Sequence, residues 1–311
     1  MGQTSLILRL EMDHSRCSFG EVATAITEAG GDITSIDVIR PGKESSIRDV
    51  TVDAGDHGEK PFLEALKNVK GLKIVNVSDR TFLAHLGGKI SIQPTLPIKN
   101  RDDLSRVYTP GVARVCEAIH EDPKKAFSLT VKRNTVAVIS DGTAVLGLGD
   151  IGPYAAAPVM EGKAMLFKQL AGVDAFPICL DTKDTEDIIR TIKAISPIFG
   201  GINLEDISSP RCFEIERRLS EELSIPIFHD DQHGTAVVVI AGLLNALKVV
   251  GKRIDQVKVV VNGIGAAGVS ICKMLLDAGV TRLVPVDREG AIVRGGRYDH
   301  PMWSWRAEQH Q

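Results

Sequence analysis

Alternating apolar and polar positions divide residues 1–82 into six short elements. Four segments predict strands: 5–12, 32–42, 45–55 and 71–79. Two segments with apolar side chains at helical spacing predict helices: 18–31 and 59–69. Ser18 is a candidate N-cap of the first helix, and Gly30 and Gly31 predict its end. The resulting order βαββαβ is the split βαβ arrangement of a small α+β domain.

A different pattern begins after a connector that contains Gly87, Gly88, Pro94 and Pro97. Here, continuous apolar runs typical of buried parallel strands alternate with helical segments. The runs are 135–142, 175–181, 199–206 and 225–231, and the helical segments are 160–173, 184–195, 209–223 and 234–250. Residues 104–122 predict a loop that enters a helix. The pattern predicts an α/β domain over 95–250 with a parallel sheet, whose sites lie at the carboxyl ends of its strands.

Residues 251–311 predict a strand, a glycine turn, a helix and a second strand. Gly263, Gly265 and Gly268, with Ala266 between them, spell G-x-G-x-x-G in the strand–turn–helix context of dinucleotide binding. In that motif the first glycine permits a tight turn, the second lets the backbone approach a pyrophosphate and the third lets helix pack on strand. The helix N-terminus favours the phosphate charge. The alternative is a glycine turn with a structural role alone.

The second strand of this segment ends at Asp287, where a carboxylate would hydrogen-bond ribose hydroxyls and repel a 2′-phosphate. This favours NAD, with NADP as the alternative because Arg288 follows directly. A doubly wound dinucleotide domain needs about six strands, and the pattern after residue 251 predicts two. We therefore expect a partial Rossmann domain in a truncated chain whose activity is impaired.

Composition is that of an ordinary globular protein, with 43% hydrophobic and 25% charged residues and a net charge of −3 among 311 residues. This balance does not attract a polyanion, so we expect no nucleic-acid partner. We read no signal peptide at the start, and the longest apolar runs fall short of the roughly 20 residues of a membrane span. Five scattered cysteines predict neither structural zinc nor disulfides. These features favour a cytoplasmic protein without a membrane partner.

Two acidic pairs stand at the ends of two predicted strands, Glu205-Asp206 and Asp230-Asp231. Hard divalent cations take carboxylate oxygens, and carboxylates that converge without a cation would repel one another. Glu205, Asp206 and Asp231 are therefore candidate ligands of Mg²⁺ or Mn²⁺. An N-cap role for Asp206, or a solvated acidic face, is the alternative.

Three other residue types are candidates for proton chemistry or a supporting role. Lys163 lies close to the first turn of a predicted apolar helix, where desolvation and a nearby cation would lower its pKa and make it a usable general base. Tyr108, in the turn of YTPGVA, is a candidate proton donor or an aromatic anchor of that turn. His229 and His233 flank the second acidic pair, and we expect supporting or structural roles for them.

Six ordered motifs between residues 100 and 295 resemble those of the bacterial malic enzyme family: YTPGVA, SDGTAVLGLGDIGP, PVMEGKAMLFK, GGINLEDISSP, IFHDDQHGTA and VNGIGAAG. The layout of residues 1–82 resembles an ACT domain, and such domains precede some bacterial malic enzymes. The resemblance implies a ferredoxin-like ACT domain, a malic-enzyme N-terminal α/β domain over 95–250 and the partial Rossmann domain over 251–311.

The resemblance further implies metal-dependent oxidative decarboxylation of L-malate to pyruvate and CO₂ with reduction of NAD(P). By motif position, Lys163 matches the general base, Tyr108 the general acid and Asp230 the acid that holds the lysine. The matching metal ligands are Glu205, Asp206 and Asp231.

Two points stay open at the level of the sequence. Where larger eukaryotic relatives carry an arginine for a malate carboxylate, this chain has Ala144. ACT domains often pair edge to edge and bind a small effector between subunits, which implies a homodimer with an effector site, although a purely structural module is equally compatible. The alternative function is therefore a non-catalytic regulatory subunit that dimerises through residues 1–82.

Overall fold

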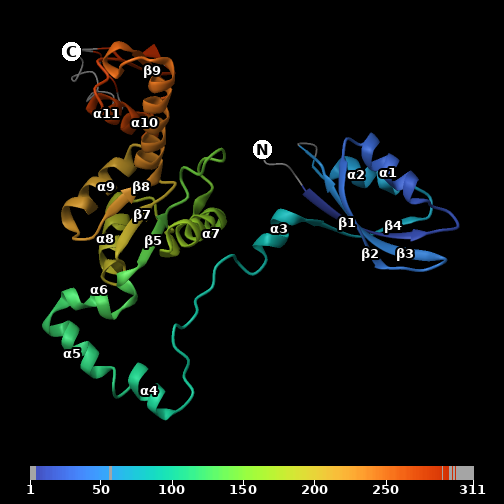
Figure 1. Cartoon of the computed structure of the whole chain (residues 1–311), viewed down its shortest axis with the longest axis horizontal. Helices are drawn as coiled ribbons and strands as arrows, with labels where there is room; N and C mark the ends of the chain where they lie inside the picture. The colour runs from blue at the N-terminus through green and yellow to red at the C-terminus, as the bar shows by residue number, and fades with distance from the viewer. Residues whose placement is uncertain (1–4, 56–57, 289, 294–295, 297, 299–311) are drawn as a thin grey trace. The chain divides into compact units, whose positions relative to one another are not determined.

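The chain forms two compact units, residues 1–89 and residues 90–311, called the N-terminal and C-terminal units below (Figure 1). The computed structural model describes residues 5–55, 58–288, 290–293, 296 and 298. The expected three-part division at 82, 95 and 251 stays a prediction, because these two units do not separate the last two parts.

The N-terminal unit is a four-stranded antiparallel sheet with the strand order β2-β3-β1-β4. Its elements are β1 Ser5–Asp13, α1 Phe19–Glu28, β2 Asp32–Arg40, β3 Ser45–Asp53, α2 Lys60–Lys67, β4 Leu72–Asp79 and α3 Arg80–His85. Figure 1 shows α1 and α2 on the same face of the sheet. The predicted βαββαβ order is confirmed, and α3 follows it.

Side-chain alternation along β1 builds the core of this unit. Leu6, Leu8, Leu10 and Met12 are buried on the helix-covered face, where they pack with Phe62 of α2. The predicted N-cap forms a full capping box, in which Ser18 Oγ accepts from the Glu21 backbone N–H and the Glu21 side chain accepts from the Ser18 backbone N–H. Local signals and burial therefore specify the same small α+β fold.

The C-terminal unit contains a four-stranded parallel sheet with the order β6-β5-β7-β8. Its strands are β5 Thr135–Ser140, β6 Asp174–Cys179, β7 Gly201–Leu204 and β8 Ile227–His229. Its helices are α7 Gly152–Ala171, α8 Thr185–Ile195, α9 Arg211–Glu222 and α10 Asp230–Val250, with the 3-10 turn η3 Ser196–Ile198. One face of β7 packs Ile202 and Leu204 into a core with α8 and α9, while α7 packs on β5 and β6. The predicted α/β architecture is confirmed.

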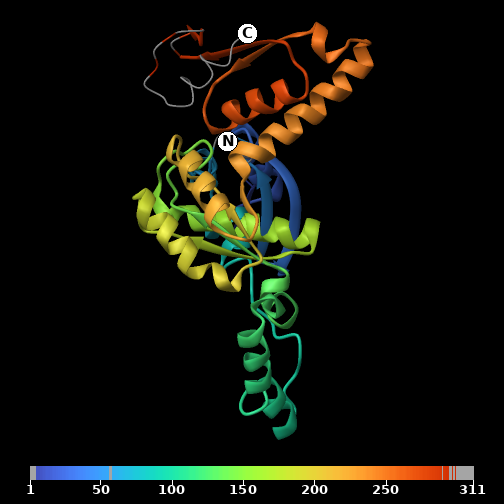
Figure 2. The same cartoon turned by 90° about the vertical axis from the view of Figure 1, so that its left-hand side faces the viewer.

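The segment ahead of this sheet has little core of its own. It comprises α4 Arg101–Val107, α5 Ala113–Glu121, η1 Pro123–Lys125, α6 Ala126–Leu129 and η2 Val131–Arg133. No residue of α4, α5 or α6 is buried. Figure 2 shows α4 and α5 away from the parallel sheet and its helices, whereas η2 contacts β5 and η3. The loop expected from residue 104 is partly wrong, because Asn100 caps α4 through its side chain and starts a helix there.

A three-stranded sheet with the order β11-β10-β9 follows, formed by β9 Lys258–Asn262, β10 Arg282–Asp287 and β11 Gly290–Ala291. β9 and β10 are parallel and are connected by α11 Ala266–Asp277, as a Rossmann unit requires. The 3-10 turn η4 Ile254–Gln256 precedes β9. The short antiparallel β11 has no counterpart in the sequence prediction. Residues 295–311, which follow the two strands predicted after residue 251, lie outside the described residues, except for Gly296 and Tyr298.

Helix α10 differs from its prediction in length. It begins at Asp230 rather than Gly234, because the second acidic pair forms its first turn. Among the described residues it is the one helix long and apolar enough to cross a membrane by length and composition, which corrects the expectation that the apolar runs are too short. Length and composition alone are weak support for a span, and α10 packs along α11 while its first turn carries two acids.

Candidate metal and substrate site

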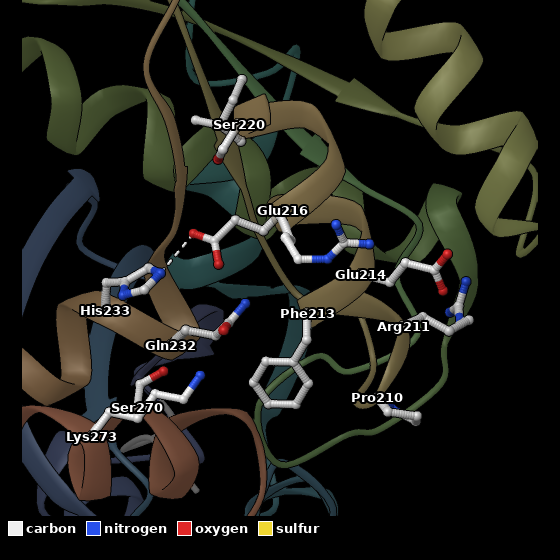
Figure 3. A pocket seen from close by; sticks show the side chains of 12 residues that line it. Pro210, Arg211, Phe213, Glu214, Glu216, Ser220, Gln232, His233, Ser270 and Lys273 are labelled. Atoms are coloured by element: carbon white, nitrogen blue, oxygen red, sulfur yellow. Dashed lines mark hydrogen bonds and ion pairs between the residues drawn. The ribbon is translucent and has the colours of Figure 1, made fainter. Parts of the chain in front are cut away.

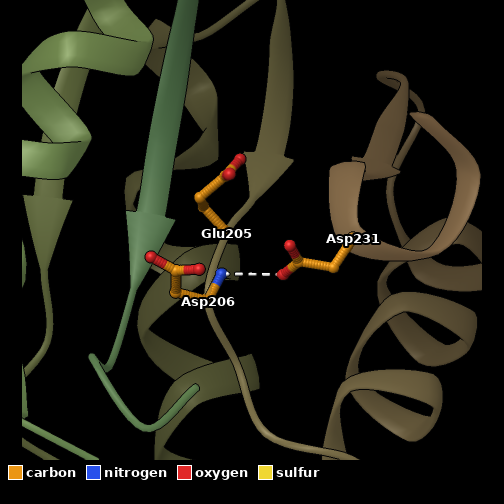
Figure 4. Close-up of side chains that lie close together, drawn as sticks. All are labelled: Glu205, Asp206 and Asp231. Atoms are coloured by element: carbon orange, nitrogen blue, oxygen red, sulfur yellow. Dashed lines mark hydrogen bonds between the residues drawn. The ribbon is translucent and has the colours of Figure 1, made fainter. Parts of the chain in front are cut away.

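The ends of β7 and β8 bring the two acidic pairs to the same edge of the sheet. These strands are parallel neighbours, with Leu204 paired to His229, so the residues that follow each strand emerge together. Ligand oxygens of Glu205, Asp206 and Asp231 all lie within 4.8 Å of one another (Figure 4). The backbone N–H of Asp206 donates to Asp231 Oδ2 at 3.0 Å, which ties the two strand ends together.

Burial makes this carboxylate cluster electrostatically unfavourable. Glu205 is 6% exposed and Asp206 is 4% exposed. Burial raises the pKa of Glu205 to about 7, against opposing contributions from Asn203 and Lys163. Burial and the Asp231 charge raise the pKa of Asp206 to about 6. A solvated acidic face therefore does not describe these two groups.

The same cluster fits a divalent cation. Buried oxygens normally have a partner, yet Asp206 Oδ2 is buried and accepts no hydrogen bond from the described residues. Three hard oxygen donors from three carboxylates suit Mg²⁺ or Mn²⁺, and a cation would relieve their mutual repulsion.

Lys163 lies beside this cluster, in the middle of α7. Its Nζ atom is 2.7 Å from Asp230 Oδ2 and 3.0 Å from Glu205 Oε1. Helix α7 begins at Gly152, earlier than predicted, and contains Pro158, a residue type that usually ends a helix. The lysine is therefore well inside the helix rather than close to its first turn.

The charge state of Lys163 also differs from the prediction. Burial lowers the pKa of its amine, but the hydrogen bond to Asp230 and the nearby Glu205 charge outweigh burial, so that the pKa is raised. Of the two influences expected to lower this pKa, burial is therefore outweighed, because two carboxylates stabilise the ammonium form.

Tyr108 is not brought to this cluster. It follows α4 in the poorly buried segment, with 65% of its surface exposed. Among the hydrogen bonds of the described residues, its backbone N–H donates to Leu104 and its carbonyl accepts from Val112, and none joins it to Lys163. Its predicted role as a general acid stays a prediction.

Two polar groups that the sequence prediction missed support the site. Asn203, 3% exposed, donates from Nδ2 to Glu205 Oε2 at 2.9 Å. Arg211 at the start of α9 donates to Asp141 Oδ2 at 2.8 Å and to the Lys183 carbonyl, which joins the loops after β5 and β6. The two-residue period of a strand could have pointed to Asn203, since it places Asn203 and Glu205 on one face of β7.

The two histidines near the second acidic pair, His229 and His233, differ in burial and in the direction of their side chains. His229 is fully buried, and neither ring nitrogen has a hydrogen-bond partner in the part of the chain that the structure describes; Nε2 is 4.0 Å from Asp231 Oδ2. His233 turns away from the cluster, with Nε2 2.7 Å from Glu216 Oε1, and this hydrogen bond raises its pKa. Figure 3 shows the His233–Glu216 pair in a separate cavity of about 710 Å³ between α9, the start of α10 and α11.

The glycine turn has the close packing that a Rossmann motif requires. Gly265 is the N-cap of α11, which begins at Ala266. A Cβ added at Gly268 would meet the Gly263 carbonyl oxygen at 2.0 Å, so that only glycine lets the helix approach the turn this closely. Asp287 ends the neighbouring strand β10, and its Oδ1 accepts from the backbone N–H of Arg288.

Comparison with known proteins gives the family. The family model described as "Malic enzyme, N-terminal domain" matches residues 87–220, and "Malic enzyme, NAD binding domain" matches residues 232–291. Together they match more than half of the chain. The chain belongs to the malic enzyme family, and the predicted resemblance is confirmed.

Individual relatives support this assignment. The chain is 66% identical over 305 residues to an NAD-dependent malic enzyme of Geobacillus stearothermophilus, and the aligned region covers 98% of this chain and 64% of the relative. It is 50% identical over 210 residues to an NADP-dependent malic enzyme of Escherichia coli, covering 67% of this chain and 28% of the relative. The crystal structure of the NAD-dependent malic enzyme of Thermotoga maritima superposes with a TM-score of 0.73 at 54% identity, covering 75% of this chain and 63% of that one. The chain thus spans somewhat under two thirds of the length of the Geobacillus relative.

Proposed function

We propose that this chain carries the metal and malate site of an enzyme that oxidatively decarboxylates L-malate to pyruvate and CO₂ while reducing NAD(P)⁺. The observation that carries the proposal is the convergence of three carboxylates, within 4.8 Å of one another, with Lys163 3.0 Å from one of them. The malic enzyme names of the relatives support the same chemistry.

Each residue of the site has a proposed role. Lys163 accepts the proton of the C2 hydroxyl as hydride leaves C2 for the nicotinamide, and Asp230 holds the amine in place. Glu205, Asp206 and Asp231 would hold Mg²⁺ or Mn²⁺. When bound, such an ion would polarise the C2 oxygen and oppose protonation of Lys163. After CO₂ leaves C3, a proton from Tyr108 completes pyruvate.

The proposed dinucleotide is NAD, with NADP as the alternative. The N-terminus of α11 offers backbone N–H groups at the glycine turn, which suits a pyrophosphate. Asp287 at the end of β10 suits ribose hydroxyls and disfavours a 2′-phosphate. Relatives with NAD-dependent and NADP-dependent names both match this chain, so that their names leave both dinucleotides open.

The test combines metal binding with turnover. We expect the 311-residue chain to bind Mn²⁺ in calorimetry and the conservative variant Asp231→Asn to lose this binding. With L-malate, NAD⁺ and Mn²⁺, we expect slow turnover in which NADH and pyruvate form in equal amounts, and we expect Lys163→Ala to bind Mn²⁺ but to abolish that turnover. Undiminished Mn²⁺ binding by Asp231→Asn, or undiminished turnover by Lys163→Ala, would overturn the proposal.

We also propose that the chain forms a homo-oligomer in the cytoplasm. The edge strand β2 exposes Ile36, Val38 and Ile39 at 43%, 54% and 51%, as a strand that pairs with a second copy would. The apolar side chains of Leu104, Phe127, Leu129 and Val131 are exposed on the poorly buried segment. All five cysteines are free thiols, which fits a reducing compartment.

The second candidate function is a regulatory chain that dimerises and binds a small effector through the ACT-like N-terminal unit. A cavity of about 590 Å³ between α3 and strands β1 and β4 favours it. Native mass spectrometry with a panel of amino acids separates the two candidates. A regulatory chain gives a dimer with a ligand-dependent mass shift and no turnover, whereas a monomer without ligand shift excludes it.

A further inference from the structure

Asn203 occupies an uncommon place for an amide side chain. It lies in the middle of β7, paired with Val138 of β5 on one side and Phe228 of β8 on the other. Its neighbours Ile202 and Leu204 point into the apolar core with α8 and α9. Because side chains alternate along an extended chain, Asn203 and Glu205, the residue directly after β7, lie on the opposite face.

A buried amide is unfavourable unless it is hydrogen-bonded. The hydrogen bond of Asn203 Nδ2 goes to Glu205 Oε2, at 2.9 Å. An ionised carboxylate can only accept, so that the amide nitrogen rather than its oxygen must face Glu205. The side chain is therefore arranged as a donor to this one carboxylate.

Glu205 is held from two sides as a result. Lys163 Nζ lies 3.0 Å from Oε1 and Asn203 Nδ2 lies 2.9 Å from Oε2, so that each oxygen has one protein donor. Each carboxylate oxygen can accept a further interaction. Without Asn203, Lys163 would be the remaining donor to this carboxylate among the described residues, and Lys163 is shared with Asp230.

We propose that Asn203 is a positioning residue that fixes the Glu205 carboxylate in the orientation in which it can bind a divalent cation. With Lys163 as its donor alone, the Glu205 carboxylate could rotate about its bond to Cγ. The Asn203 amide and the Lys163 amine together fix the plane of the carboxylate. Partners of this kind around metal ligands typically change metal affinity 10- to 100-fold. The inference rests on the proposed metal site and deepens it.

Mn²⁺ binding to the whole chain, measured by calorimetry at pH 8, tests the inference. Asn203→Leu keeps the volume and removes the donor, and we expect Mn²⁺ affinity to fall at least tenfold. Asn203→Asp keeps the shape but replaces the donor by an acceptor, and we expect it to weaken Mn²⁺ binding as well. Asn134→Asp is the matched control, because Asn134 is an exposed donor to Asp174 at the far end of the sheet.

The outcomes separate three readings. Affinity of both Asn203 variants within twofold of the parent would overturn the inference, as would tighter binding by Asn203→Asp, since then negative charge rather than orientation would govern affinity. If Asn203→Leu does not fold, the Mn²⁺ affinity of Asn203→Asp decides alone: weaker binding supports the inference, and unchanged or tighter binding overturns it. Failure of the parent chain itself to bind Mn²⁺ would overturn the proposed function instead.

Discussion

Gly234 is the residue whose substitution should most selectively disturb the proposed base. It lies one turn after Asp230 in α10, and a Cβ built there would be 2.2 Å from Asp230 Oδ1. An ordinary contact of this kind is at least 3.4 Å. In Gly234→Ala the Asp230 carboxylate must therefore move by about 1 Å, and we expect this movement to lengthen and weaken the 2.7 Å contact between its Oδ2 atom and Lys163 Nζ.

The expected effect is on proton affinity rather than on folding. Alanine is a better helix former than glycine by up to about 1 kcal/mol, so that the variant should be as stable as the parent or more stable. The hydrogen bond to Asp230 raises the pKa of Lys163. Weakening it should lower that pKa, and each unit corresponds to about 1.4 kcal/mol.

Pulse acetylation with acetic anhydride at a series of pH values, read by peptide mass spectrometry, measures this change because only the neutral amine reacts. We expect the Lys163 labelling curve of Gly234→Ala to move to lower pH. Gly242→Ala is the matched control in the same helix, where a Cβ would have no neighbour within 4 Å. Superimposable Lys163 curves for the two variants would refute the reasoning.

Three further predictions follow from burial and charge. The raised pKa values of Glu205 and Asp206, about 7 and about 6, mean that their protonated forms favour folding. This contribution to stability is complete below the pKa values of the unfolded chain and is lost as pH rises through 6 to 7. Because protons and Mn²⁺ compete for the same carboxylates, Mn²⁺ should raise Tm more at pH 8 than at pH 5. Phe62→Ala should lower the free energy of unfolding by about 3–5 kcal/mol in urea, because Phe62 is fully buried. Arg211→Met should lower the free energy of unfolding by about 3 kcal/mol in the same assay, because it leaves the buried Asp141 without an ion-pair partner and with Thr143 as its remaining donor.

Controls for these predictions come from exposed counterparts. Phe82 is 75% exposed and Arg217 pairs with Glu221 at the surface, so Phe82→Ala and Arg217→Met should each change stability by no more than about 0.5 kcal/mol. Equal Mn²⁺-induced Tm shifts at the two pH values would show that proton competition at the carboxylates is absent. Equal losses for a buried variant and its exposed counterpart would show that burial does not govern the effect.

The meeting of the acidic pairs was predictable because it depends on topology. Parallel neighbouring strands end at one edge, so two apolar runs that each end in acids predict a common cluster. The βαββαβ order of the N-terminal unit was equally predictable, since its periodicity, its capping box and its glycines agree.

Side-chain direction and charge balance were not predictable in the same way. The sequence placed Lys163 in an apolar segment, which favours a low pKa, but two carboxylates from β7 and α10 reach it and reverse the direction. The start of α7 was missed because Pro158 looks like a helix boundary, although Pro153 at the first turn allows the helix to begin there. Tyr108 was grouped with the site by motif order, which carries no information about distance.

The first turn of α10 explains why the second acidic pair is not redundant. Consecutive residues of a helix point about 100° apart, so Asp230 and Asp231 cannot face the same partner. Asp230 reaches Lys163 at 2.7 Å, while Asp231 accepts from the Asp206 backbone at 3.0 Å. His233, a further two residues along, reaches Glu216 on α9. A helix that began at Gly234, as the apolar pattern alone suggested, would leave these acids in a loop without such fixed directions. Because the helix starts at Asp230, Asp230 contacts the Lys163 amine while Asp231 joins Glu205 and Asp206 in the carboxylate cluster.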